Sequence, residues 1–228
     1  QIAAQFVSRQ PPNGRTLLFA TSSAILAGPH LQPGFNPLKE LAAVSLLTRF
    51  PGVLVVPASS PLKTIEDVIS EARRNPGKLT YATSGNGSMN HLAGEMLKMM
   101  TGINIVHIAY KGAAIAATDL ASGTVQIFFS TVPGVMPFIR GGRVKAIAAA
   151  TAQRFRGMPE LPTVNETVPG FECQGWYGLI GPDGIPKPIV GALNRLVNEV
   201  LVLPDVAPLG SATVTSFSER PQRQRRSH

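Results

Sequence analysis

The segment "YATSGNGSMNHLAGEMLKMMTG", Tyr81 to Gly102, carries the strongest structural signal in this sequence. A β-type run ends at Thr83, a glycine-rich turn follows, and a helical pattern begins near Ser88, a good N-cap residue. Gly102 is a suitable helix terminator. The pattern predicts an amphipathic helix over 88–101, whose apolar stripe would be Met89, Leu92, Ala93, Met96, Leu97 and Met100.

The turn from Ser84 to Ser88 has two interpretations. It can simply join a strand to a helix. Alternatively, Gly85 and Gly87 leave backbone N–H groups uncovered at the positive end of the helix dipole, which is a suitable place for an anion. The turn is neither a P-loop nor G-x-G-x-x-G, because no Gly-Lys-Ser/Thr follows and Asn90 replaces the third glycine. The segment alone leaves both alternatives open.

The composition limits the protein class. The chain has 228 residues, 44% hydrophobic and 15% charged, as in a globular protein. The net charge is +8, but about three of these charges lie in the eleven-residue tail "SERPQRQRRSH", and only 6% of residues are aromatic. We therefore expect no nucleic-acid partner. A single cysteine, Cys173, excludes an internal disulfide and a Cys-rich zinc site.

The rest of the chain alternates between strand and helix patterns. From 64 to 150 the predicted order is α-β-α-β-α-β-α-β, which favours a parallel sheet covered on both faces. Ligands bind such sheets beyond the carboxyl ends of the strands, where the Ser84–Ser88 turn lies. The two extended runs 53–57 and 171–180 bracket this block, so we expect a domain inserted into another and a hinged, two-lobed protein.

Several motifs in order and spacing carry a family resemblance. They are "GKLTYATSGNGSMNHLAGEMLK", "VHIAYKGAAIAATDLASGTVQIFF", "VPGVMPFIRGGRVKAIAAAT", "MPELPTVNE" and "GWYGLIGPDGIPKPIV". Over residues 1 to 205 the sequence resembles the Bug family, the periplasmic solute-binding proteins of tripartite tricarboxylate transporters. The resemblance implies an α/β, two-lobed Venus flytrap of class II that is not an enzyme. It also implies a small carboxylate ligand (a di- or tricarboxylate, an acidic amino acid or an aromatic carboxylate), a membrane permease partner and a periplasmic location.

The resemblance also gives expected domains and departures from the family. We expect residues 1–57 with 171–205 to form a first lobe that is incomplete at its N-terminal side, and 58–170 to form the inserted second lobe. Residues 206–228 form a basic tail that diverges from the family and is expected to be disordered. Because part of the first lobe would be absent, ligand binding would be impaired. We expect a monomer without a cofactor.

The predicted ligand-binding residues come from both lobes. The anion-site interpretation, favoured by the resemblance, places Ser84, Gly85, Asn86, Gly87 and Ser88 at the ligand. Further candidates are His91 one turn into the helix, Thr21 and Ser22 after an earlier strand, and Ser130 after "QIFF", where many family members have aspartate. Each has an ordinary structural alternative as a cap, turn or surface residue.

Two other functions remain alternatives. The first is an α/β enzyme acting on a small anionic substrate. A hydrolase, however, would need a serine between the glycines of a strand–helix elbow, which "SGNGS" lacks. The four histidines show no metal-ligand spacing, so neither a catalytic nor a metal site is expected. A nucleic-acid binder would depend on the basic tail and would lose affinity steeply with salt.

Overall fold

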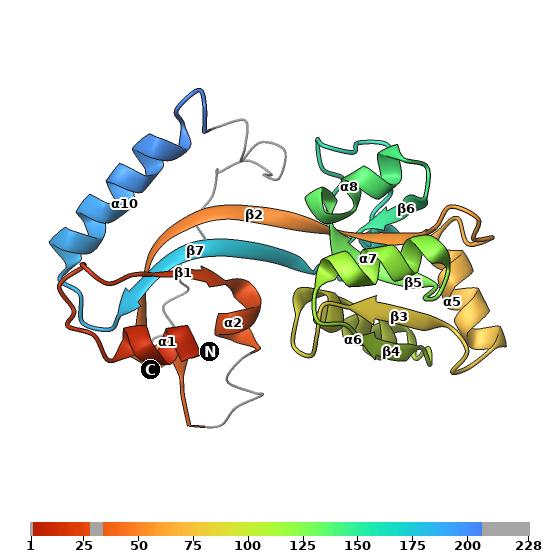
Figure 1. The fold of residues 1–228 in the computed structure, drawn as a ribbon, viewed down its shortest axis with the longest axis horizontal. Helices are drawn as coiled ribbons and strands as arrows, with labels where there is room; N and C mark the ends of the chain where they lie inside the picture. Colours follow the sequence, from red (N-terminus) through yellow and green to blue (C-terminus); the bar gives the residue numbers. More distant parts are fainter. Residues whose placement is uncertain (1, 28–33, 207–228) are drawn as a thin grey trace.

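The computed structural model describes residues 2–27 and 34–206, and its elements form two lobes connected by two strands (Figure 1). The smaller lobe contains α1 (Ile2–Ser8), β1 (Leu18–Thr21), α2 (Ser22–Leu26), α4 (Pro37–Glu40) and α10 (Lys187–Leu201). The larger lobe contains α5 (Ile65–Arg74), β3 (Thr80–Thr83), α6 (Met89–Thr101), β4 (Val106–Ala109), α7 (Ala113–Ser122), β5 (Ile127–Thr131), α8 (Val132–Arg140), β6 (Val144–Ala149) and α9 (Val164–Thr167).

The two connecting strands are β2 (Leu41–Pro57) and β7 (Gln174–Pro182), which pair antiparallel from Leu41↔Pro182 to Pro51↔Gln174. Pro51 and Gly52 lie inside β2 and do not end it. β2 is one continuous strand, and its partner changes there from β7 to β5. Gly52 allows this close junction, because a Cβ atom would lie 3.3 Å from the Cys173 carbonyl oxygen.

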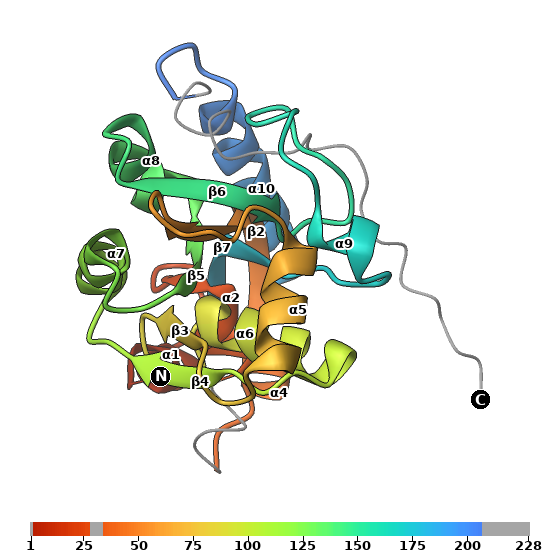
Figure 2. The same cartoon turned by 90° about the vertical axis from the view of Figure 1, so that its right-hand side faces the viewer.

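In the larger lobe, the strand order is β6-β2-β5-β3-β4. β3 is parallel to β4 and β5, whereas β2 runs antiparallel to both of its neighbours, β5 and β6. Figure 2 shows α7 and α8 on one side of this sheet and α5, α6 and α9 on the other. The expected alternating α/β block covered on both faces is confirmed, with one strand of opposite direction in its middle.

That middle strand belongs to the core of the larger lobe. Val53, Leu54, Val55 and Val56 of β2 are fully buried and divide between the two hydrophobic clusters on opposite faces of the sheet. Residues 41–51 of β2 pair with β7, whereas residues 52–57 pair with β5 and β6. The division into lobes at residues 57 and 171 stays a prediction.

Helix α6 begins and ends as its sequence predicts, but its buried face differs. Ser88 caps it, and Gly102 ends it with a left-handed backbone. The buried residues are Met89, Asn90, Ala93, Gly94 and Leu97, whereas the predicted stripe members Leu92 and Met100 are exposed. The reason is Gly94: a Cβ atom there would lie 2.3 Å from the Tyr81 ring, so the helix lies with its glycine against that ring.

In the smaller lobe, β1 pairs with β7, and the sheet packs against α1 and α10. The stretch after β1 is the short helix α2. On α10, Asn194 donates to the Val44 carbonyl oxygen (2.9 Å), but no residue of this helix is buried among those that the structure describes. The predicted tail lies outside the described residues from 207 onward.

Candidate functional site

The turn between β3 and α6 depends on two glycines. Gly85 and Gly87 have φ angles of 127° and 73°, which side-chain-bearing residues rarely adopt. Between them, Asn86 is exposed, and Ser88 then turns the chain into α6. The predicted residues Ser84 to Ser88 therefore form one compact turn at the carboxyl end of β3.

Both serine hydroxyl hydrogens are already donated, one within the turn and one to the first turn of α6. The Ser88 hydroxyl donates to the Gly85 carbonyl oxygen (2.6 Å) and accepts from the N–H of His91 (3.3 Å). The Ser84 hydroxyl donates to Oδ1 of Asn90 (2.6 Å). Neither hydroxyl can donate to a ligand carboxylate without giving up its present acceptor.

Backbone N–H groups are the donors that the turn leaves available. Within the described part of the chain, the N–H groups of Asn86, Met89 and Asn90 have no hydrogen-bond partner, while that of Gly85 donates to Oγ1 of Thr83 (3.2 Å). Met89 and Asn90 occupy the first two positions of a 13-residue helix, where unpaired N–H groups and the helix dipole favour an anion.

Two histidines lie beside this turn. The N–H of Gly87 donates to Nδ1 of His91 (3.2 Å), and the His91 and His107 rings are 4.4 Å apart between centroids. Nε2 of His107 is 2.6 Å from Oγ1 of Thr83. Burial lowers the pKa of His107, and the nearby His91 lowers it further. His91 thus contacts the predicted turn. Its Nδ1 accepts from the N–H of Gly87, so this N–H is not available to a ligand.

Asn90 is the residue that the sequence analysis missed. It is buried, accepts from Ser84 and donates through Nδ2 to the carbonyl oxygen of Phe129 on β5. Its amide therefore ties the turn to the strand that carries Ser130. A polar residue directly beside the predicted apolar stripe was the available signal, but locating its partner required the tertiary structure.

Ser130 and the first turn of α6 both lie near the junction in β2. Ser130 is buried opposite Val53, and the following residue, Thr131, is opposite Gly52. A Cβ atom on Gly52 would lie 3.5 Å from the sulfur of Met89. The larger lobe therefore brings Ser130 and the Ser84–Ser88 turn to the same end of its sheet.

Thr21 and Ser22 belong to the smaller lobe. Thr21 caps α2 by accepting from the N–H of Ala24 (3.3 Å), and Ser22 accepts from the N–H of Trp176 (3.3 Å). Trp176 pairs with Arg49 on β2, only three residues before Gly52, or about 10 Å along a strand. In Figure 1, α2 lies on the side of the smaller lobe that faces the larger one. The predicted residues thus flank one section of the crossing strands.

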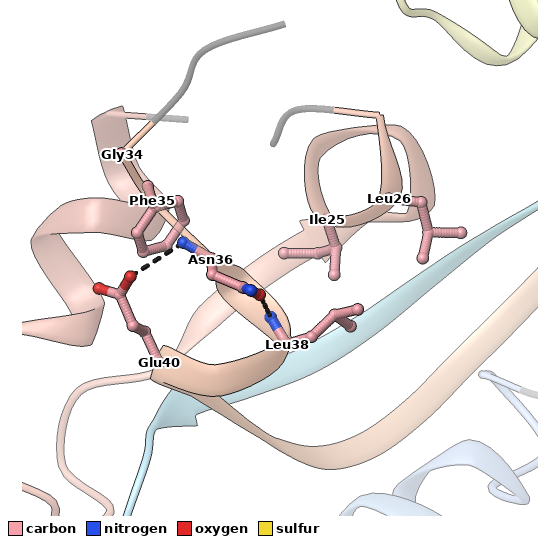
Figure 3. A pocket seen from close by; sticks show the side chains of 7 residues that line it. All are labelled: Ile25, Leu26, Gly34, Phe35, Asn36, Leu38 and Glu40. Atoms are coloured by element: carbon pink, nitrogen blue, oxygen red, sulfur yellow. Dashed lines mark hydrogen bonds between the residues drawn. The ribbon is translucent and has the colours of Figure 1, made fainter. Parts of the chain in front are cut away.

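The pocket in Figure 3 lies elsewhere. It has a volume of about 700 Å³ in the smaller lobe, between α2 and the segment 34–40, and none of the predicted binding residues lines it. Its polar groups pair with one another: Glu40 accepts from the N–H of Asn36 (2.9 Å), and Asn36 accepts from that of Leu38 (3.1 Å). The other side chains that line this pocket, Ile25, Leu26, Phe35 and Leu38, are apolar.

The described residues contain no cluster of three or more His, Cys, Asp or Glu side chains that could hold a metal ion. Burial raises the pKa of the Cys173 thiol to about 11, so it stays protonated at neutral pH. Among the described helices, none has the length and apolar character needed to cross a membrane.

Comparison with known proteins decides the family. The model of the "Tripartite tricarboxylate transporter family receptor" matches residues 1–223. This chain belongs to that family. The match extends past residue 205, beyond which the sequence was expected to diverge from the family. The predicted family, with its Bug-protein relatives, is confirmed.

Two curated relatives illustrate the similarity. A UPF0065 protein from Pseudomonas sp. (strain P51) is 32% identical over 209 residues, or 90% of this chain. Protein BugT from Bordetella pertussis is 33% identical over 204 residues, or 88% of this chain. The chain spans only 62% and 63% of the lengths of these two relatives.

Solved structures confirm the two-lobed Venus flytrap fold. R. palustris Rpa4515 with adipate has a TM-score of 0.77 at 32% identity, covering 91% of this chain and 71% of that one. MatC from Rhodopseudomonas palustris with bound malate has a TM-score of 0.80 at 28% identity, covering 95% and 76%. A third structure, of a periplasmic transporter, has a TM-score of 0.81 at 32% identity, covering 94% of this chain and 74% of that one. Solved structures similar to this chain therefore include two with a small dicarboxylate bound.

Proposed function

We propose that this chain captures a small carboxylate between its lobes and delivers it to the membrane permease of a tripartite tricarboxylate transporter. The observation that carries the proposal is the set of unpaired N–H groups of Asn86, Met89 and Asn90 at the start of α6. One carboxylate group can accept from several such donors, and each charged hydrogen bond contributes about 1.5–3 kcal/mol.

The position of the turn supports the same function. The Ser84–Ser88 turn, Ser130, Thr21 and Ser22 flank the crossing strands. A ligand held there would contact both lobes, and closure of the lobes would add contacts that the turn alone cannot provide. The adipate and malate in related structures support a di- or tricarboxylate over a larger anion.

The finer properties belong to this proposal as well. We infer that the protein acts in the periplasm as a monomer, and that it releases its ligand unchanged. The hydroxyl of Thr83 pairs with Nε2 of His107 (2.6 Å), but Thr83 is fully buried, so a substrate does not reach it, which favours binding over an enzymatic reaction. The basic tail lies outside the described residues, so the nucleic-acid alternative rests on sequence alone.

The test adds charge at the turn. We expect Asn86→Asp to weaken binding of adipate or malate about tenfold or more, because a carboxylate beside the N–H groups repels the ligand. Asn86→Ala should stay within about threefold of wild type, since the exposed side chain has no structural partner in the described residues. Isothermal titration calorimetry measures both.

A charge-matched control separates local repulsion from a change in net charge. Asn104→Asp adds the same charge beyond the opposite end of α6, about 20 Å away along the helix. Equal affinities for Asn86→Asp, Asn104→Asp and wild type would show that the turn is only a connector. If neither ligand binds wild type, the proposed function itself fails.

A further inference from the structure

His91 and His107 form a titratable cluster that connects helix α6 to strand β4 beside the proposed binding turn. The two ring centroids are 4.4 Å apart, and the His107 ring also stacks on Tyr81 at 5.0 Å. Each histidine reaches a different part of the turn: His91 through the N–H of Gly87, and His107 through Thr83, which accepts from the N–H of Gly85.

The hydrogen bond from Gly87 sets the protonation state of His91. A backbone N–H can only donate, so Nδ1 of His91 must be without a proton, and the neutral ring carries its hydrogen on Nε2. In this state the N–H of Gly87 is occupied. In the empty turn, the N–H of Gly87 is therefore not available to a ligand. In the chain it lies between Asn86 and Met89, whose N–H groups have no partner among the described residues.

The carboxylate that faces His91 from its own helix is Glu95, and a positive charge on His91 lowers the pKa of Glu95. Glu95, one helical turn away, is already occupied: it accepts from Lys98 (2.7 Å) and from the Tyr81 hydroxyl (2.6 Å). Although burial raises the pKa of Glu95, these hydrogen bonds lower it overall, so it stays a carboxylate. Burial is the main cause of the lowered pKa of His107, and this lowering favours the neutral ring. His91 is therefore the ring that a ligand charge can influence.

Resting on the proposed function, we propose that His91 couples carboxylate binding at the turn to the uptake of one proton. A proton from solvent adds to Nδ1, and the hydrogen bond from Gly87 breaks. The Gly87 N–H and the new Nδ1–H then both face the ligand as donors. The empty site favours neutral His91, and the occupied site favours the imidazolium.

The direction of the pH dependence follows from this coupling. Because the ligand stabilises the protonated ring, the proton affinity of His91 is higher in the complex than in the free protein. Binding must then strengthen as the pH falls, by at most tenfold per pH unit, and protons must be taken up in the window between the two titrations. Small carboxylic acids themselves stay ionised through the range in which histidine titrates.

The experiment is calorimetry with adipate and with malate between about pH 6 and pH 8, where an unperturbed histidine changes charge. We expect the wild-type affinity to rise about tenfold toward pH 6. Titrations in buffers of different ionisation enthalpy should give an uptake of up to about one proton per ligand. In His91→Asn, whose side-chain oxygen can replace Nδ1 as acceptor but cannot titrate, both effects should disappear.

His107→Gln is the matched variant, because its amide can pair with Thr83 without titrating. It should retain the pH dependence and the proton uptake. Affinity that is independent of pH in wild type, or the same pH dependence in His91→Asn, would overturn the inference and leave the proposed function standing. Absence of binding at every pH would overturn both.

Discussion

The two lobes differ in how much apolar surface they bury. Within the described residues, the larger lobe has hydrophobic clusters on both faces of its sheet, with 21 and 14 buried residues. The cluster of the smaller lobe has seven. Large apolar side chains such as Phe6, Phe19 and Leu196 are exposed in the smaller lobe. The proposed binding turn thus lies in the lobe with the larger hydrophobic core, which supports it rigidly. Thr21 and Ser22 lie in the lobe with the smaller core and are supported more weakly.

The largest expected effect comes from removing one aromatic ring in each lobe. Phe129 is fully buried and stacks on Phe171 at 5.9 Å, so Phe129→Ala should lower the free energy of unfolding by about 3–5 kcal/mol. Phe19 is 61% exposed and stacks on Tyr177, so Phe19→Ala should cost less than about 1.5 kcal/mol. Urea unfolding measures both. Equal losses would contradict the difference between the lobes.

A second pair adds one methyl group to each lobe. A Cβ atom at Gly94 would meet the buried Tyr81 ring at 2.3 Å, so Gly94→Ala should destabilise the larger lobe by about 1–3 kcal/mol. At Gly181 the close atom is Cδ1 of Ile185 (2.4 Å), the flexible end of a side chain, so Gly181→Ala should stay within about 0.5 kcal/mol. Thermal unfolding checks this pair, and a stable Gly94→Ala variant would show that the Tyr81 ring can move.

These glycines also show how far the sequence predicts the structure. Local signals were sufficient for α6, because its cap Ser88 and its terminator Gly102 act within a few residues. They failed for its buried face, since the contact between Gly94 and Tyr81 joins two elements through the sheet. The same holds at the site: the turn was predictable, but the bonds from Asn90 to β5 and from His107 to Thr83 were not.

The smallest expected effect concerns an exposed ion pair at the edge of the larger lobe. Arg154 holds Glu166 through two hydrogen bonds of 2.9 and 2.8 Å, and these bonds, with the N–H of Thr163, lower the pKa of Glu166 to about 2. A lowered native pKa stabilises the fold above the unfolded value of about 4.3 and stops doing so as the pH falls toward 2.

Glu166→Gln should therefore lower the melting temperature slightly at pH 7, with a difference that shrinks below about pH 4. Thermal unfolding of both proteins across this range gives the comparison. A difference that is constant with pH would assign the effect to the capping bond at Thr163 and not to the charge.

The continuous strand β2 has a consequence for the order of folding. Its first part pairs with β7, and the chain between these two partners contains nearly the whole larger lobe. Before that lobe forms, pairing β2 with β7 requires closure of a very long loop, which costs chain entropy. Once β5 and β6 have paired with residues 52–57, Pro51 and Gln174 are already neighbours, and the remaining pairs can form by zipping. We therefore expect the smaller lobe to assemble last, on a template supplied by the larger one.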